Sequence, residues 1–181
     1  MKKKTIALIL SCVLVLGCAI GGTIAWLTDK TAAIANTFTV GNVDIELTET
    51  TGENYKMVPG TTITKDPTVT VKDGSEACWL FVKVEKSTNA SFDEFMNYDM
   101  AEGWTALTGV DGVFYRDVPS NAAVRSFSVL KDNTVTVKSD VTKEEMDALT
   151  DATRPTLTFT AYAVQQQGFT DVATAWEEAS K

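Results

Sequence analysis

The stretch ACWLFVKVEK, residues 77–86, decides the fold of this chain. Its even-numbered residues from 78 to 84 are all apolar, and the intervening Trp79 and Phe81 are apolar as well. A strand of this composition is covered on both faces, whereas from Lys83 onward only one face stays apolar. We therefore predict a central β-strand that is buried on both sides over its first half.

Shorter strand patterns, separated by turn signals, flank the central strand on both sides. They occupy residues 36–49, 57–75, 103–119, 123–140 and 155–166. Helical patterns are confined to short stretches, one of which starts with a capping-box signature formed by Thr142 and Glu145. Many short strands with little helix predict an all-β fold, an antiparallel jelly roll or β-sandwich with a few short helices.

The first 25 residues have the composition of an export signal. Three lysines precede an uncharged run from residue 5 to residue 28, which supplies the positive flank and apolar centre of an N-terminal signal helix. Thr23 and Ala25 are the small residues that a signal peptidase accepts, so that cleavage leaves Trp26 as the new N-terminus. We predict a signal peptide at residues 1–25 and a single β-sandwich domain at residues 26–181.

Two other outcomes compete with cleavage after Ala25. The sequence VLGC at residues 15–18 is an imperfect lipobox that would attach lipid to Cys18, with leucine where a small residue is usual. If nothing is cut, the uncharged run is long enough to cross a bilayer of about 30 Å. Gly21 and Gly22 weaken a helix there, so we favour cleavage and secretion, with membrane contact only through the uncleaved signal.

Charge and composition exclude several classes of function. The chain has 16 basic and 24 acidic residues and no histidine; leaving out the three lysines at 2–4 gives 13 minus 24, a formal charge of −11. Such a surface repels phosphate backbones, so we expect no nucleic-acid partner. The lack of histidine removes histidine-based catalysis and the usual zinc sites. We expect no catalytic residue, no metal and no cofactor, and Cys78 as a small buried hydrophobe.

Carboxylate pairs remain the possible source of acid/base or calcium chemistry. The candidates are Asp93 with Glu94, Asp99 with Glu102, and Glu144 with Glu145. None has the spacing of a calcium loop, and adjacent acids at a helix start are usually solvated charges that complement the helix dipole. We interpret these pairs as structural, which leaves an enzyme as a remote hypothesis.

Two motifs near the N-terminus carry a family resemblance. GGTIAWLTD at residues 21–29, followed by NTFTVGNVDI at 36–45, resembles the TasA/camelysin group of Gram-positive bacteria, and PG at 59–60 followed by TKD at 64–66 is similar to that group's turn and strand entry. The resemblance implies a signal processed by a dedicated SipW-type signal peptidase. It also implies a jelly-roll domain secreted to the cell surface or biofilm matrix, where subunits join into fibres by donating an N-terminal strand. Camelysins are named for a metalloprotease activity, which we do not extend to a chain without histidine.

Residues 26–49 are the candidate donor strand. Cleavage after Ala25 frees a chain end that can enter another molecule's sheet, where strand addition supplies a ladder of main-chain hydrogen bonds and buries alternate side chains. The competing interpretation is that this segment is the first strand of its own domain. The apolar residues that we expect to be buried on donation are Phe38, Val40, Val43, Ile45 and Leu47.

A second class of function is compatible with the same fold. An exported, monomeric β-sandwich can bind a carbohydrate or a surface protein through its end loops, here residues 88–112. The two classes differ in self-association, because a fibre subunit polymerises as its concentration rises and a binding module stays monomeric.

Overall fold

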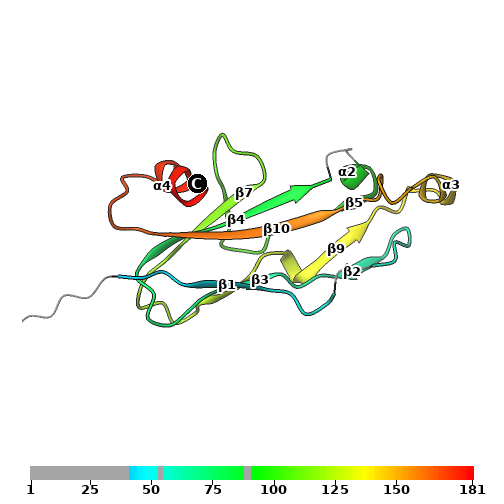
Figure 1. The fold of residues 1–181 in the computed structure, drawn as a ribbon. Helices are drawn as coiled ribbons and strands as arrows, with labels where there is room; N and C mark the ends of the chain where they lie inside the picture. The colour runs from blue at the N-terminus through cyan, green and yellow to red at the C-terminus, as the bar shows by residue number, and fades with distance from the viewer. Residues whose placement is uncertain (1–40, 53–54, 88–90) are drawn as a thin grey trace, which may run out of the picture. The chain divides into compact units, whose positions relative to one another are not determined.

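The computed structural model describes residues 41–52, 55–87 and 91–181, and these belong to one compact unit. Two layers of antiparallel strands face each other, with short helices at their ends and on one outer face (Figure 1). The predicted signal helix lies outside the described residues. The architecture confirms the predicted all-β sandwich.

The first layer is a four-stranded sheet built around the predicted central strand. Its strand order is β10-β4-β7-β6, and every neighbouring pair is antiparallel. The strands are β4 (Cys78–Lys86), β6 (Thr105–Ala106), β7 (Val113–Val118) and β10 (Leu157–Gln165). The turn between β6 and β7 needs Gly112, whose φ is +71° and whose position leaves no room for a Cβ beside the Val84 carbonyl. That close approach lets the Val84 N–H donate to the Gly112 carbonyl at 2.7 Å.

The second layer consists of two short sheets that follow one another along the chain. Their orders are β1-β3-β8 and β2-β9-β5. The strands are β1 (Ile45–Thr48), β2 (Thr62–Thr64), β3 (Thr68–Val71), β5 (Met96–Asn97), β8 (Ser126–Ser128) and β9 (Thr134–Val137). Between β8 and β9 lies the 3-10 turn η1 (Lys131–Asn133), in which Asp132 has a φ of 54°. The chain crosses between the layers repeatedly, from β3 to β4, β4 to β5, β5 to β6, β7 to β8 and β9 to β10, as in a jelly roll.

Three short α-helices complete the unit. They are α2 (Ser91–Phe95), α3 (Lys143–Asp147) and α4 (Val172–Ala179). The predicted capping box is present at α3, where Thr142 and Glu145 exchange hydrogen bonds. Helix α4 covers the face of the β4 sheet that points away from β1 and β3 (Figure 1), with Ala175 fully buried and the Trp176 ring 5.3 Å from that of Phe81.

The main core lies between the two layers. Val69 and Val71 from β3 pack against Leu80 and Val82 from β4, and all four are 0% exposed. Cys78 belongs to the same cluster, and burial raises the pKa of its thiol to about 11. The thiol therefore stays protonated and behaves as the small buried hydrophobe that the sequence predicted.

The two long sides of the sandwich are closed differently. On the side of β7 and β8, the Arg116 guanidinium is stacked between the Phe127 ring at 4.0 Å and the Trp104 ring at 4.9 Å. The Trp104 indole N–H donates to the Ser128 carbonyl at 2.8 Å, which ties the two layers together. On the opposite side the outermost strands are β1 and β10, which lie next to each other.

Candidate functional site

The candidate site starts from β1, because this strand contains the last part of the predicted donor segment. It pairs with β3 in an antiparallel register that places Ile45 opposite Val71 and Leu47 opposite Val69. No described strand pairs with its other edge. In the described structure β1 is thus an edge strand of its own domain.

A turn at residues 72–76 holds the start of β1. The Glu76 N–H donates to the Asn42 carbonyl at 2.9 Å, the Lys72 N–H donates to the Asp44 carbonyl at 2.8 Å, and the Asp44 N–H donates to the Ser75 hydroxyl at 3.1 Å. The Lys72 ammonium also lies 3.9 Å from the Asp44 carboxylate. These contacts fix the point at which the chain enters the domain.

A polar clip holds the chain just after β1. The Lys65 ammonium donates to the Glu49 carboxylate at 2.6 Å, and only 12% of the Lys65 side chain is exposed. The Asp66 carboxylate accepts hydrogen bonds from the backbone N–H groups of Thr50 and Thr51, at 2.9 and 3.1 Å, and from their hydroxyls. Because these hydrogen bonds favour the ionised form, they lower the pKa of Asp66 to about 2.

The predicted donor residues divide into two groups. Val43 and Ile45 are half-buried and pack against the main core, whereas Leu47 is 36% exposed. The structure therefore uses the last part of the segment within its own sheet. The residues predicted for donation or for signal cleavage that lie outside the described part of the chain are Thr23, Ala25, Trp26, Phe38 and Val40.

Strand β10 forms the second edge on this side of the sandwich. The Ser87 N–H donates to the Thr156 carbonyl at 3.0 Å and the Gln166 N–H donates to the Ala77 carbonyl at 2.8 Å, so even-numbered residues of β10 bond to β4. Backbone groups alternate in an antiparallel ladder, which turns those of the odd-numbered residues outward. The outward set is Leu157, Phe159, Ala161, Ala163 and Gln165.

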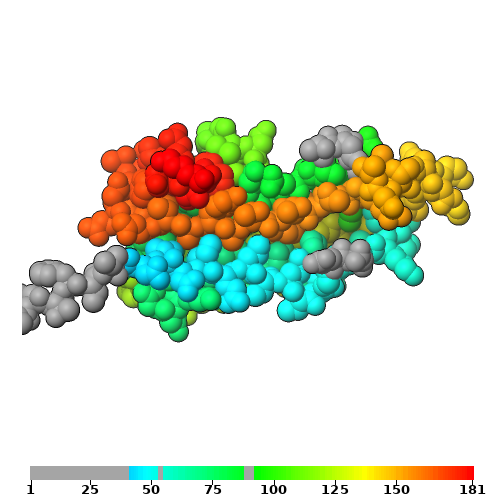
Figure 2. All heavy atoms as spheres, in the orientation of Figure 1, coloured from blue at the N-terminus to red at the C-terminus, as the bar shows by residue number. Residues whose placement is uncertain are grey.

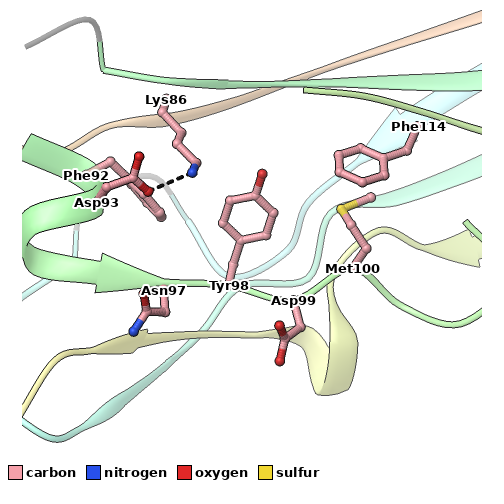
Figure 3. A pocket seen from close by; sticks show the side chains of 8 residues that line it. All are labelled: Lys86, Phe92, Asp93, Asn97, Tyr98, Asp99, Met100 and Phe114. Carbon is pink, nitrogen blue, oxygen red and sulfur yellow. Dashed lines mark hydrogen bonds and ion pairs between the residues drawn. The ribbon is translucent and has the colours of Figure 1, made fainter. Parts of the chain in front are cut away.

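A separate hollow lies at the end of the sandwich, within the loops that the sequence proposed for ligand binding. It has a volume of about 270 Å³ and is shown in Figure 3. Lys86 enters it from β4, donates to the Asp93 carboxylate at 2.6 Å, and lies 5.8 Å from the Phe92 ring and 5.6 Å from the Tyr98 ring. The hollow thus combines an ion pair with two aromatic rings.

Tyr98 stands in the middle of this hollow, between Lys86 on one side and Met100 and Phe114 on the other (Figure 3). Burial raises the pKa of its hydroxyl above the ordinary value for tyrosine, at which the group is already a hydrogen-bond donor at neutral pH. Asn97 and Asp99 point to the opposite side of the chain from Tyr98 (Figure 3), toward an adjoining hollow of about 240 Å³. The hollow around Tyr98 therefore offers aromatic rings beside a carboxylate and an ammonium group.

A larger hollow of about 530 Å³ lies between β2, β9 and the start of β10. Its floor is apolar and includes Met57, Ile63 and Leu157. The cations at its rim are already paired, Lys65 with Glu49 and Arg154 with Asp151 at 2.7 Å. The hollow thus combines an apolar floor with ion pairs at its rim.

Two of the carboxylates in the predicted pairs have structural partners. Asp93 pairs with Lys86, and Glu145 caps α3 through Thr142. Within residues 41–52, 55–87 and 91–181, no three side chains of the His, Cys, Asp and Glu types are grouped to hold a metal ion. In the same residues, no helix is both long and apolar enough to cross a bilayer.

The sequence predicted end loops at residues 88–112, but not which residues line the hollow there or which strands lie at the sheet edges. Lys86 was part of the central strand pattern, and its partner Asp93 was considered only as half of an acidic pair. The outward edge of β10 was missed because the sequence does not show which strands are outermost. Its uncharged composition over nine residues was the available signal.

Comparison with known protein families gives a match over the first part of the chain. The sequence model of the family described as camelysin metallo-endopeptidase matches residues 1–102, which is more than half of the chain. No curated protein matches. The matched part contains β1 to β5 and the hydrogen-bonded entry into β1.

Proposed function

The chain belongs to the camelysin/TasA family of secreted Gram-positive proteins, and from this premise we propose that it is a structural subunit of the cell surface or biofilm matrix. Subunits associate by donating the N-terminal segment within residues 26–49 to a neighbour after signal cleavage. The observation that carries the proposal is the place of β1: it is an edge strand, directly preceded by the segment that cleavage after Ala25 frees.

The physical basis of the proposal is strand addition. An added strand gains main-chain hydrogen bonds along its length and buries alternate side chains against the acceptor. Phe38 and Val40 supply the apolar alternation ahead of β1. While the signal is attached, the same segment is tethered to a membrane and unable to enter another molecule. Processing by a dedicated signal peptidase therefore starts assembly.

Two lengths of the mature protein test this function. A chain that starts at Trp26 is expected to form polymers whose size rises with concentration in sedimentation velocity, whereas a chain that starts at Gly41 is expected to stay monomeric. Circular dichroism of the shorter chain controls for folding, since the described residues form a compact unit without residues 1–39. Equal behaviour of the two chains, as monomers or as polymers, would refute assembly through the N-terminal segment.

The family description names a metallo-endopeptidase, and we propose that this chain does not act as a zinc endopeptidase. Zinc in such enzymes is held by three protein ligands that usually include histidine, and the chain contains no histidine. The carboxylates and Cys78 of the described residues are not grouped as a three-ligand set. Purified protein with added Zn²⁺ is expected to leave casein intact; proteolysis abolished by a chelator would overturn this.

A second candidate function rests on the hollow around Tyr98. We propose that an unassembled, secreted subunit binds a saccharide there, with the aromatic rings against the sugar face and Lys86 and Asp93 directed at hydroxyl groups. Titration with soluble amino-sugar oligosaccharides, followed by calorimetry, is expected to give a heat that Tyr98→Ala removes and Asp111→Asn keeps. Equal heats from all three proteins would rule the site out.

A further inference from the structure

Strand β10 presents the longest unpaired edge among the described strands. It spans nine residues, compared with four in β1, three each in β2 and β8, and two each in β5 and β6. Figure 2 shows it running uncovered along the face on which β1 also lies. We propose that this edge is the acceptor site for a neighbouring copy's residues 26–40, which rests on the proposed function and names the surface where the donated segment binds.

The composition of β10 favours strand addition. The sequence LTFTAYAVQ contains no charged residue and no proline, and both are devices by which soluble proteins protect exposed edges. The outward backbone groups of Phe159, Ala161 and Ala163 are spaced to form a regular ladder with an added strand. Their side chains pack toward the core between the layers, so that an added strand extends the sheet without disturbing α4.

The length of the donor segment fits this edge. Nine residues of strand cover about 30 Å. Residues 26–40 extend to about 50 Å when fully stretched, which covers β10 and leaves a short connection. The last ten residues of the segment, TAAIANTFTV at 31–40, carry no charge. An uncharged donor on an uncharged edge avoids the repulsion that two acidic domains otherwise exert on each other.

The entry point into β1 favours donation to another copy over folding back within one copy. Asn42 is bonded to Glu76, and Gln166 is bonded to Ala77, so β1 begins at the end of the domain where β10 stops. A segment that paired with its own β10 has to reverse direction immediately before Asn42. The hydrogen bonds at Asn42 and Asp44 hold the chain from Asn42 onward, so such a reversal uses up residues of the segment that would otherwise pair with β10. A second copy imposes no such turn.

Proline at position 161 tests the acceptor edge. The Ala161 N–H points outward, so Ala161→Pro removes no hydrogen bond to β4 and places a ring where the added strand has to bind. Ala161→Pro is expected to lose polymerisation while still donating its own segment. The chain that starts at Gly41 has the opposite defect, because it keeps the acceptor edge and lacks the donor segment.

Mixing the two defective proteins gives the decisive measurement. Each alone is expected to sediment as a monomer, and the mixture is expected to form a one-to-one complex with the summed mass and no larger species. Ala163→Pro, which blocks the same edge closer to its end, is expected to act like Ala161→Pro. A thermal melt of both variants confirms that the fold is retained.

The other outcomes separate failure of the inference from failure of the function. If wild-type protein starting at Trp26 does not polymerise at all, the proposed function fails and the acceptor proposal fails with it. If both folded proline variants polymerise like wild type, assembly is real and the acceptor is not β10. If the chain starting at Gly41 forms a dimer that Ala161→Pro abolishes, β10 pairs with itself, and the assignment to residues 26–40 is overturned.

Discussion

Asp66 shows how one carboxylate can hold the start of the domain in place. It accepts hydrogen bonds from Thr50 and Thr51 immediately after β1, and these lower its pKa to about 2. The group is ionised in the unfolded chain above about pH 4. Because the pKa of Asp66 is lower in the native state than in the unfolded chain, its ionised carboxylate stabilises the fold above about pH 4. This contribution is lost as the pH falls through the native pKa of about 2.

Asp66→Asn is therefore expected to lower the melting temperature at pH 7, with a difference from wild type that shrinks as the pH falls from about 4 to about 2. Asp111→Asn, on an exposed loop, is the matched control and is expected to melt like wild type at both ends of that range. A pH-independent difference between Asp66→Asn and wild type would contradict the assignment.

Arg116 joins the two layers through stacking on Trp104 and Phe127. Arg116→Ala is expected to reduce the free energy of unfolding by about 1–3 kcal/mol, the range for a partly desolvated cation between two rings. Arg116→Lys is expected to recover only part of the loss, because an ammonium lacks the planar surface of a guanidinium. Urea denaturation measures both, and full recovery by lysine would show that charge alone matters.

At the level of elements, local sequence signals explain the strands better than their arrangement. The pattern of residues 77–86 predicted the central strand, and Thr142 with Glu145 predicted the start of α3. Both features depend on residues that are neighbours in the sequence, so they can be predicted from it. Strand order depends on contacts between distant residues. Two such long-range contacts are the pairing of β4 with β10 and the ion pair between Lys65 and Glu49. No local pattern reveals them.

The pairing of strand β1, in the candidate site, likewise could not be predicted from local sequence. The sequence left open whether this strand is donated or belongs to its own domain, and its pairing with β3 is the intramolecular form. Ile45→Asp is expected to destabilise the isolated domain by about 2–3 kcal/mol, because it places a charge against the main core. Thr48→Asp introduces the same group at an exposed position and is expected to change stability little. Equal effects in urea denaturation would show that Ile45 contributes no burial.

A disulfide can test whether β1 takes part in the proposed strand exchange. Glu46 and Thr70 lie opposite each other in the β1–β3 register, at a separation that a disulfide can span. Glu46→Cys with Thr70→Cys, oxidised before assembly, is expected to polymerise like wild type, because residues 26–40 remain free. Polymerisation that appears only after reduction would show that β1 itself is exchanged. Cys78 is fully buried and does not compete.

At the scale of the whole molecule, the dominant property is negative charge. Without the first 25 residues the chain carries a formal charge of −11, and like-charged copies repel one another over about 10 Å at an ionic strength of about 0.1 M. The concentration needed for assembly is therefore expected to fall severalfold between about 20 mM and about 300 mM NaCl. Sedimentation at the two salt concentrations measures it, and a threshold that rises with salt would indicate attraction between charged groups instead.

The stacked Arg116 side chain has a consequence for the form of any assembly. It lies on the long side of the sandwich where the outermost described strands are the three-residue β8 and the two-residue β5 and β6. In the proposed assembly each subunit offers the nine-residue β10 edge and inserts one N-terminal segment, so it has a valence of two. Subunits with two unlike binding surfaces polymerise in one dimension and without branches, so we expect the proposed polymers to be linear.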